Sequence, residues 1–313
     1  MKAKVVFFII VMFVPVMLQA QNESWYQKGR DATNPLEMVQ FYTKSLETEG
    51  TSVCTYYYRG IAKLELNDFN GAEDDFTNAI RTEFKSHPGA QNKTDSMNTK
   101  DCRERSYFYS GSTNYNLQNY QAAIKDFSQF IIIDTENQEY QKMRNNAYNL
   151  RSASYYFLKQ FDLALADISK YISLKPNDPN GYNNRGLIYL IQTRYDDAIS
   201  EFNKTLSINP EYASALADIG YACMQQGKMD LAIDNFTRCL KIDTNTFSTY
   251  LDLAIIYYLK GNLQESKKYM TVATSLESGL EEGFDSINEL EKEGYYWTEK
   301  DKETLKKMFN ELK

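Results

Sequence analysis

Residues 179–212 read PNGYNNRGLIYLIQTRYDDAISEFNKTLSINPEY, and residues 213–246 read ASALADIGYACMQQGKMDLAIDNFTRCLKIDTNT. The two segments match at a spacing of 34 residues, which places Gly186 in register with Gly220 and continues through an alanine and a phenylalanine. Self-similarity at a fixed period indicates repeated structural units that stack on one another. Length alone, 313 residues, would suggest two globular domains, so the repeat changes the prediction.

The same phase extends over most of the chain. It predicts six units of 34 residues, of which the last four are contiguous. Insertions of 17 residues (87–103) and 7 residues (138–144) separate the first three units. The units comprise residues 53–86, 104–137, 145–178, 179–212, 213–246 and 247–280.

Two positions of the 34-residue unit always hold small side chains. Position 8 is occupied by Gly60, Gly111, Ser152, Gly186, Gly220 and Ala254. Position 20 is occupied by Ala72, Ala123, Ala164, Ala198, Ala232 and Ser266. Positions 17 and 24 are large and apolar in every unit. Two helices joined by a tight turn approach closely where both side chains are small, so the pattern predicts helix pairs that touch at positions 8 and 20.

This pattern, together with Pro176 and Pro210 at position 32, resembles the tetratricopeptide repeat family over residues 53–280. The resemblance implies an all-α fold, an α-solenoid in which about six helix pairs wind into a right-handed superhelix. Position 27 departs from the family pattern, because Phe130 and Tyr171 replace a small residue there. We therefore expect a looser or shifted contact between units at these two places.

The N-terminus differs from the repeats. Residues 1–20 carry Lys2 and Lys4 before an uncharged apolar run, the layout of a secretory signal peptide that is cleaved after Ala20. An uncleaved N-terminal anchor is the alternative interpretation. No second apolar stretch is long enough to span a membrane, so we expect an exported protein, periplasmic or secreted, without a membrane span in its mature chain.

We expect further helices to close the repeat array at both ends. Residues 21–52 form an N-terminal segment in which residues 36–46 fall in phase as a lone second helix, a half-repeat. Residues 281–313 form C-terminal capping helices, where Leu305 and Met308 belong to an apolar stripe. Such caps are required because an exposed end of a solenoid would be apolar.

In tetratricopeptide repeats the first helix of each unit lines a concave groove, with positions 2, 5, 9, 12 and 13 facing inward. On this sequence the resemblance implies a groove that is aromatic and almost without charge. The candidate partner-binding residues are Arg105, Phe108, Tyr115, Asn146, Asn149, Tyr156, Asn180, Asn183, Tyr221 and Tyr258. The implied partner is a protein or peptide, for which the tyrosines would supply anchors.

The asparagines recur within this predicted groove. Asn146 and Asn180 share position 2, and Asn149 and Asn183 share position 5, one repeat apart. A side-chain amide both donates and accepts hydrogen bonds, so such a series would pair with the backbone of an extended peptide. The alternative is that the asparagines are solvated and the groove tyrosines pack between neighbouring helices.

Charge and residue content argue against other classes of function. Lys and Arg number 35 against 42 Asp and Glu, a net charge of −7, which disfavours binding to nucleic acid. The single histidine, His87, lies in the polar insertion 87–103, where we expect a surface loop. No nucleophile, acid cluster or glycine loop has the spacing of a known site, so we expect no catalytic residue, metal ion or cofactor.

The chain has four cysteines, and disulfides are permitted in an exported protein. Cys54 begins the first helix of the first unit and Cys102 just precedes the first helix of the second unit. Two interpretations stay open: they form a disulfide that pins the long insertion, or they stay reduced. Cys223 and Cys239 are expected to be buried and unpaired.

Together these features predict a non-catalytic protein–protein interaction scaffold that binds an extended peptide or partner segment in its concave groove. The alternative is a structural subunit of an envelope assembly, which would dock through its convex face or its ends.

Overall fold

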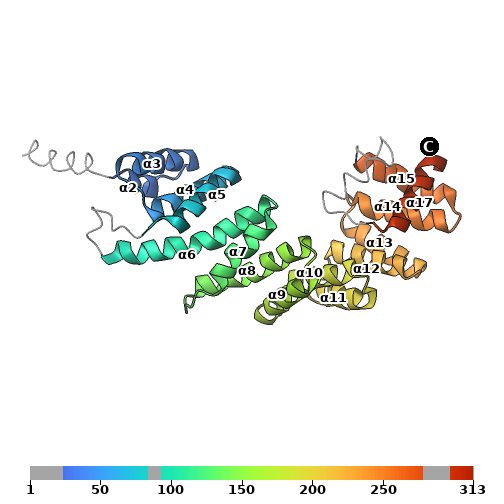
Figure 1. Cartoon of the computed structure of the whole chain (residues 1–313). Coiled ribbons are helices and arrows are strands. Elements are labelled where there is room, and N and C mark those ends of the chain that lie inside the picture. The colour runs from blue at the N-terminus through green and yellow to red at the C-terminus, as the bar shows by residue number, and fades with distance from the viewer. Residues whose placement is uncertain (1–23, 84–92, 278–296, 313) are drawn as a thin grey trace, which may run out of the picture. The chain divides into compact units, whose positions relative to one another are not determined.

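The computed structural model describes residues 24–83, 93–277 and 297–312, and in these ranges every regular element is an α-helix. Consecutive helices pack side by side as pairs (Figure 1). The helices are α2 (Trp25–Asp31), α3 (Pro35–Thr48), α4 (Val53–Glu65), α5 (Phe69–Arg81), α6 (Lys93–Asn116), α7 (Tyr120–Ile131), α8 (Gln138–Phe157), α9 (Phe161–Leu174), α10 (Pro179–Ile191), α11 (Tyr195–Ile208), α12 (Ala213–Gln225), α13 (Met229–Ile242), α14 (Phe247–Leu259), α15 (Leu263–Leu276) and α17 (Glu299–Leu312). The predicted all-α solenoid of helix pairs is confirmed for these ranges, while the predicted signal peptide and His87 lie outside them.

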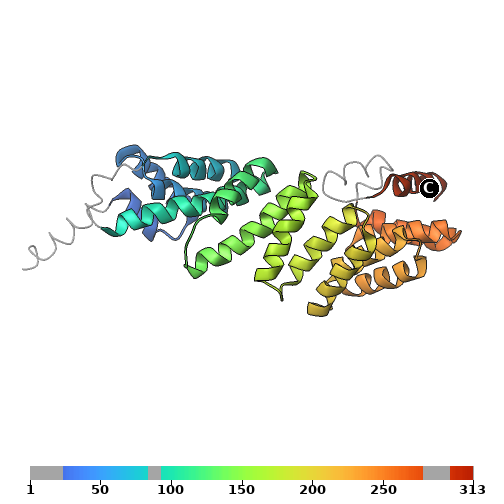
Figure 2. The same cartoon turned by 60° about the horizontal axis from the view of Figure 1, so that its bottom comes forward.

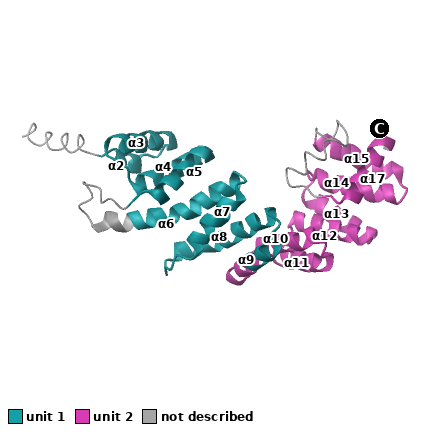
Figure 3. Cartoon of the chain, viewed as in Figure 1, with its two compact units in different colours: residues 1–167 teal, residues 168–313 magenta. Residues whose placement is uncertain are grey.

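The chain divides into two compact units, residues 1–167 and 168–313 (Figure 3). We call them the N-terminal unit and the C-terminal unit and describe each by itself. The N-terminal unit holds α2 to α8 and the start of α9, and the C-terminal unit holds the rest of α9 and α10 to α17.

One left-handed residue joins the two helices of every repeat. It occupies position 15, where φ lies between 58° and 76°, in Asn67, Gln118, Lys159, Thr193, Gly227 and Gly261. The next backbone N–H then donates to the carbonyl of position 11, as from Asp68 to Lys63 at 2.9 Å. A non-glycine residue in this conformation costs roughly 1 kcal/mol, and four of these six turns bear that cost.

The predicted contact between positions 8 and 20 is present where Ser152 donates to the carbonyl of Ala164 at 2.8 Å and Ser266 to that of Ala254 at 2.9 Å. The glycines of position 8 also lie against the rings of position 24, a contact that was not predicted. A Cβ atom on Gly186 would lie 2.5 Å from the ring of Phe202, and one on Gly220 would lie 2.7 Å from the ring of Phe236. Gly60 and Gly111 meet rings in the same way. The absent side chain makes room for a fully buried phenyl group, and this close approach sets the spacing of the helix pair.

The large residues at position 27 have specific partners, so the expected looser contact is not needed to place them. Phe130 is buried and stacks on Tyr140 of the next repeat, with ring centres 5.6 Å apart. Tyr171 lies against Gly181, where an added Cβ would stand 3.0 Å from its ring. In each case the following helix supplies either an aromatic surface or a gap.

The two predicted insertions are at least partly helical. The segment 138–144 forms the first two turns of α8, begun by Asn137, whose side chain accepts from the backbone N–H of Glu139 at 2.8 Å. Its residues Tyr140 and Met143 are buried, which makes the extension part of the core. Residues 93–103 of the other insertion likewise belong to α6. A pattern counted in units of 34 assigns such added turns to insertions because they precede position 1.

At the N-terminus a helix pair replaces the predicted half-repeat. Helix α2 packs on α3, and a Cβ atom on Gly29 would lie 2.5 Å from the ring of Tyr42, the same contact that glycine and ring make in the repeats. Trp25 stacks on Phe41 with ring centres 6.0 Å apart. Helix α2 ends two residues after Gly29, whereas α4 ends five residues after Gly60, which displaces Gly29 from the 34-residue phase and hides the first helix from the pattern.

Candidate partner-binding surfaces

Buried ion pairs join the two helices of several repeats through positions 7 and 23. Arg59 donates two hydrogen bonds to Asp75 at 2.6 and 2.9 Å, and Lys63 lies 2.8 Å from the same carboxylate. Arg151 binds Asp167 in the same bidentate way, at 2.6 and 2.8 Å. Both carboxylates are buried, so paired charge-assisted hydrogen bonds replace their lost hydration.

The same arginines also reach the preceding repeat. Each donates a further hydrogen bond to a hydroxyl there, in the pairs Arg59–Thr43 (3.1 Å), Arg151–Ser128 (2.9 Å) and Arg185–Ser169 (3.3 Å). In the second repeat Ser110 replaces the arginine and donates to Asp126 at 2.7 Å, and burial raises the pKa of Asp126. These polar groups therefore hold the stack together and are not available to a ligand.

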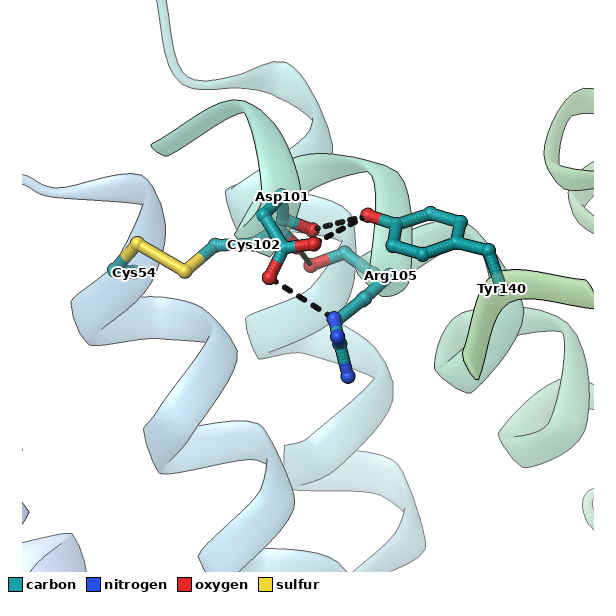
Figure 4. Close-up of a disulfide and its surroundings, with 6 residues drawn as sticks. Cys54, Asp101, Cys102, Arg105 and Tyr140 are labelled. Atoms are coloured by element: carbon teal, nitrogen blue, oxygen red, sulfur yellow. Dashed lines mark hydrogen bonds and ion pairs between the residues drawn. A yellow bond between two sulfur atoms is a disulfide. The ribbon is translucent and has the colours of Figure 1, made fainter. Parts of the chain in front are cut away.

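A disulfide joins Cys54 of α4 to Cys102 of α6, with Cα atoms 5.3 Å apart (Figure 4). Both residues are buried, and the bond fastens the N-terminal extension of α6 to the first repeat. Cys223 and Cys239 are free and buried, as the sequence led us to expect.

Arg105, the one cation among the candidate groove residues, is already paired. Its Nε donates to Asp101 at 3.0 Å, and its two Nη atoms donate to Glu139 at 2.6 and 2.7 Å. Tyr140 donates from its hydroxyl to the same Asp101 at 2.7 Å (Figure 4). The hydrogen bonds with Glu139 raise the pKa of Arg105 and lower the pKa of the Glu139 carboxyl. This arrangement fixes the arginine in place and neutralises it.

The aromatic candidates of the N-terminal unit separate into two groups by their contacts. Phe108 is half-buried and packs on Phe127 and Phe130, with ring centres 6.0 and 5.4 Å away. The second group, which we call the aromatic patch, surrounds the exposed Phe157 with the half-buried rings of Tyr115, Tyr120, Tyr156 and Phe161.

Stacking holds the aromatic patch together. Tyr120 and Phe157 stack face to face with centres 4.6 Å apart and planes 9° from parallel, and Tyr115 contacts both rings. Phe157 nevertheless remains 43% exposed. Tyr120 and Phe161 were not among the predicted groove residues, because a large side chain at position 17 is expected to fill the space beside the contact between the two helices.

The asparagine pairs fall into different units. Asn146 is exposed and Asn149 partly buried in the N-terminal unit. In the C-terminal unit, Asn180 accepts a hydrogen bond from the hydroxyl of Tyr212 at 2.8 Å and donates to Asp178 at 2.9 Å. Asn183 is buried, and its Oδ1 has no hydrogen-bond partner among the described residues. Since each unit is described by itself, the proposed peptide ladder stays a prediction.

In the C-terminal unit, α17 lies on the first helices of the last two repeats, as a layer over them in Figure 2. Tyr221 and Gln225 of α12 donate to Asp301 of α17 at 3.0 and 2.8 Å, and Tyr258 of α14 donates to Glu311 at 2.8 Å. The surface beneath α17, which we call the α12–α14 face, carries Tyr221, Met224, Gln225, Leu251 and Tyr258. Both candidate tyrosines of this unit therefore bind the chain's own C-terminal helix.

Near the start of α17, Asp252 of α14 lies within electrostatic range of Asp301 of α17 and Asp218 of α12. Burial raises the pKa of Asp218 to about 7, and burial, with the charge of Asp301 next, raises the pKa of Asp252 well above its ordinary value. The indole N–H of Trp297 donates to Asp252, whose Oδ1 has no partner among the described residues. Asp301 accepts from Thr298 and caps the first turn of α17.

The described residues hold no group of three or more histidine, cysteine, aspartate or glutamate side chains arranged to bind a metal ion. Among them there is also no helix both long enough and apolar enough to cross a membrane.

Comparison with known proteins identifies the repeats. Family models described as tetratricopeptide repeat match residues 146–178, 179–212 and 213–246. A comparison with curated protein sequences gave no match.

Solved structures share the fold at low sequence identity. The C-terminal part of a TPR repeat-containing protein from Cytophaga hutchinsonii is 16% identical, with 82% of this chain and 95% of that chain covered, at a TM-score of 0.56. The Cut9–Hcn1 hetero-tetramer of the APC/C is 15% identical over 84% of this chain and 46% of that chain, at a TM-score of 0.55. MamA is 22% identical over 62% of this chain and 92% of that chain, at a TM-score of 0.48.

The chain contains tetratricopeptide repeats, assigned by family models over residues 146–246, within an α-solenoid of helix pairs.

Proposed function

We propose that this protein is an exported, non-catalytic interaction scaffold that binds an extended segment of a partner protein along the first helices of its repeats. Tetratricopeptide repeats act in general as protein-interaction scaffolds, which sets the class of function. The aromatic patch is the observation that carries the proposal for this chain. Export agrees with the Cys54–Cys102 bond, because disulfides persist in oxidising compartments.

The aromatic patch has the properties of an anchoring surface. Its rings pack against one another, with Tyr120 and Phe157 stacked and Tyr115 edge-on to Tyr120, so a bound segment would lose little of its energy to ordering them. Phe157 exposes apolar area, and the rings of Tyr115 and Tyr156 lie beside it with ring centres 6.2 and 5.4 Å away. Positions 12 and 13, which these three residues occupy, are positions that the repeat family turns to its groove.

Photo-cross-linking in the native host tests the proposal. A photoreactive phenylalanine analogue replaces Phe157 in one variant and Leu163 in the other; Leu163 is 49% exposed on α9, the second helix of the same repeat. Mass spectrometry then identifies the joined peptides. We expect adducts with one partner segment from position 157. In a binding assay with that segment, Phe157→Ala should weaken affinity at least tenfold, roughly 1.4 kcal/mol, whereas Leu163→Ala leaves it unchanged.

A second candidate function is a structural subunit that docks through the outer face. Leu163 and Leu231 both occupy position 19 of a second helix and are 49% and 56% exposed, which favours contact on that side. Adducts from position 163 with none from position 157 would support this candidate and contradict the first. Terminal sequencing of the protein from its host tests export separately, with cleavage after Ala20 as the expected result.

A further inference from the structure

Helix α17 covers positions that the repeat family turns to its groove. In the third repeat, Tyr156 and Phe157 occupy positions 12 and 13, and Phe157 remains 43% exposed. In the fifth repeat, Met224 at position 12 is buried, and Gln225 at position 13 donates a hydrogen bond to Asp301 of α17 at 2.8 Å. The chain itself therefore occupies these groove positions in the C-terminal unit.

The apolar contact lies along one side of α17. Three of its side chains follow the spacing i, i+3, i+4 and are at most 3% exposed, namely Leu305, Met308 and Phe309. They belong to the same core cluster as Met224 and Leu251 of the α12–α14 face. On the opposite side of α17, Lys307 pairs with Glu303, and their side chains are 60% and 69% exposed. A helix that packs along one side only opens locally at a lower free-energy cost than helices enclosed in the core.

The polar contacts join acids of α17 to neutral donors of the face. The Oδ2 atom of Asp301 accepts from the hydroxyl of Tyr221 at 3.0 Å and from the side-chain amide of Gln225 at 2.8 Å. At the other end of α17, the hydroxyl of Tyr258 donates to Glu311 at 2.8 Å. A hydrogen bond to a carboxylate is stronger than one to a neutral acceptor, so the face favours an acid at both places.

The first turn of α17 also forms from its own sequence. The backbone N–H of Asp301 donates to Oγ1 of Thr298 at 3.2 Å, and the backbone N–H of Thr298 donates to Oδ2 of Asp301 at 2.9 Å. These reciprocal bonds have the arrangement of a capping box, which satisfies backbone groups at the start of a helix. A segment of another protein with the same local sequence features can therefore form the same helix.

We propose that the α12–α14 face binds an amphipathic helix of a partner protein, and that α17 is a built-in copy of that helix that occupies the face until the partner displaces it. The recognised helix carries an acid in its first turn and apolar side chains four, seven and eight residues later, as α17 does after Asp301. An amphipathic helix on an apolar surface is a recurring mode of recognition between proteins. The proposal rests on the proposed scaffold function and assigns a separate site to the C-terminal unit.

Peptide binding tests the recognition chemistry. The loosened chain is the full chain with Leu305→Ala and Met308→Ala, and the probe is a labelled peptide of residues 297–312, WTEKDKETLKKMFNEL. Fluorescence anisotropy should show the loosened chain binding this peptide about tenfold more tightly than the wild-type chain, in which α17 competes. Asp301→Ala in the peptide should weaken binding about fivefold. Glu299→Ala, at a side chain that is 91% exposed, is the matched control and should leave binding unchanged.

A double-mutant cycle separates recognition of the acid from its role in starting the helix. Tyr221→Phe in the loosened chain removes one donor of the face. It should weaken binding of the native peptide severalfold and leave binding of the Asp301→Ala peptide unchanged. Tyr257→Phe, at a ring that stacks on Tyr269 of α15, is the control and should affect neither peptide. An equal effect of Tyr221→Phe on both peptides would contradict the assigned preference for an acid.

Amide hydrogen exchange distinguishes a displaceable helix from a structural cap. In the loosened chain without peptide, α17 should lose its protection while α12 to α15 keep theirs. Loss of protection in α14 and α15 as well would show that α17 is an integral part of the fold and would overturn the proposal. No binding of the peptide to a loosened chain that is folded would also overturn it. If the doubly substituted chain does not fold, Leu305→Ala alone takes its place.

Photo-cross-linking in the native host tests for the partner. A photoreactive phenylalanine analogue replaces Tyr258 in the wild-type and in the loosened chain. We expect adducts with α17 in the wild-type chain, and in the loosened chain adducts with a partner segment that carries the acid and the apolar stripe at the stated spacing. Adducts with α17 alone in both chains, or a joined segment without that spacing, would count against the proposal. Such a failure is distinguishable from failure of the scaffold function, because the cross-links from position 157 report on the N-terminal unit and do not depend on α17.

Discussion

The first and the last repeat hold the same helix pair together with different chemistry at the same positions. In the first repeat, positions 7 and 23 hold the ion pair of Arg59 with Asp75, and the pairs Arg151–Asp167 and, in the C-terminal unit, Arg185–Glu201 repeat it. A disulfide also fastens two repeats of the N-terminal unit together. In the last repeat of the C-terminal unit the same positions hold Leu253 and Tyr269. We infer that the geometry of the helix pair depends on the residues at positions 8 and 24 and on the turn. The other contacts between the two helices vary from repeat to repeat.

Loss of the disulfide should have the largest effect on stability. We expect that effect in the N-terminal unit and not in the C-terminal unit. The bond closes a loop of 48 residues, for which the loop-entropy model gives a stabilisation of about 4 kcal/mol. Cys54→Ala with Cys102→Ala should therefore destabilise the N-terminal unit and leave α12 to α15 unaffected. Amide hydrogen exchange followed by mass spectrometry measures both units at once. Equal loss of protection in the C-terminal unit would contradict the prediction that only the N-terminal unit is destabilised.

Removal of a buried carboxylate should come next. Asp75→Ala leaves Arg59 and Lys63 without their shared partner in a buried setting, and we expect a loss of about 3 kcal/mol in the free energy of unfolding. The matched control is Asn235→Ala at the same repeat position in the C-terminal unit. Asn235 bonds only the carbonyl of Leu231 in its own helix and Arg238 beside it, so its loss should cost below about 1 kcal/mol. Urea titrations compare the two.

A glycine substitution tests the contact between positions 8 and 24, which both units contain. Gly220→Ala brings a methyl group within 2.7 Å of the Phe236 ring and should destabilise the C-terminal unit by about 2 kcal/mol. Phe236→Leu added to it should recover part of the loss, with a coupling of about 1 kcal/mol in a double-mutant cycle. Additive effects of the two changes would show that ring and glycine do not depend on each other.

The smallest expected effect is a change in pH dependence. Raised pKa values of Asp218 and Asp252 mean that the folded C-terminal unit binds more protons than the unfolded chain. Their stabilisation is present below about pH 4 and is lost as pH rises through the two raised pKa values, of which that of Asp218 is about 7. Asp252→Asn should flatten this slope and stabilise the unit by about 1 kcal/mol at pH 8. Asp234→Asn, at a carboxylate 66% exposed, is the control in thermal melts and should leave the slope unchanged.

The period of 34 was sufficient to predict the helix pairs and the burial of position 24, because a glycine and a ring at fixed spacing reflect local packing. The 34-residue pattern did not predict the helical turns that precede position 1 of a unit. The segment 138–144 is helical since Asn137 caps it and Tyr140 packs on Phe130, and neither contact repeats along the chain. Gly29 was missed because α2 ends only two residues after it, which shifts its register relative to the repeats.

The candidate surface was less predictable than the fold. The groove positions of the repeat family indicate which side chains of a first helix face the groove. They do not indicate which other parts of the chain cover that helix. Arg105 and Phe108 are engaged within the N-terminal unit, and Tyr221 and Tyr258 bind α17. These contacts join residues far apart in sequence, so no local sequence pattern predicts them.

The fit between glycine and ring has a consequence for how such repeats diverge. Neither member of the couple tolerates a change made alone, because a methyl group at Gly220 meets the ring and a smaller side chain at Phe236 leaves a void. The last repeat holds Ala254 at position 8 and Met270 at position 24, a combination intermediate between a repeat with the glycine–phenylalanine pair and one without it. The flexible thioether of Met270 adapts to the methyl group of Ala254. New repeats of this array would accordingly gain their phenyl group only after the glycine is in place.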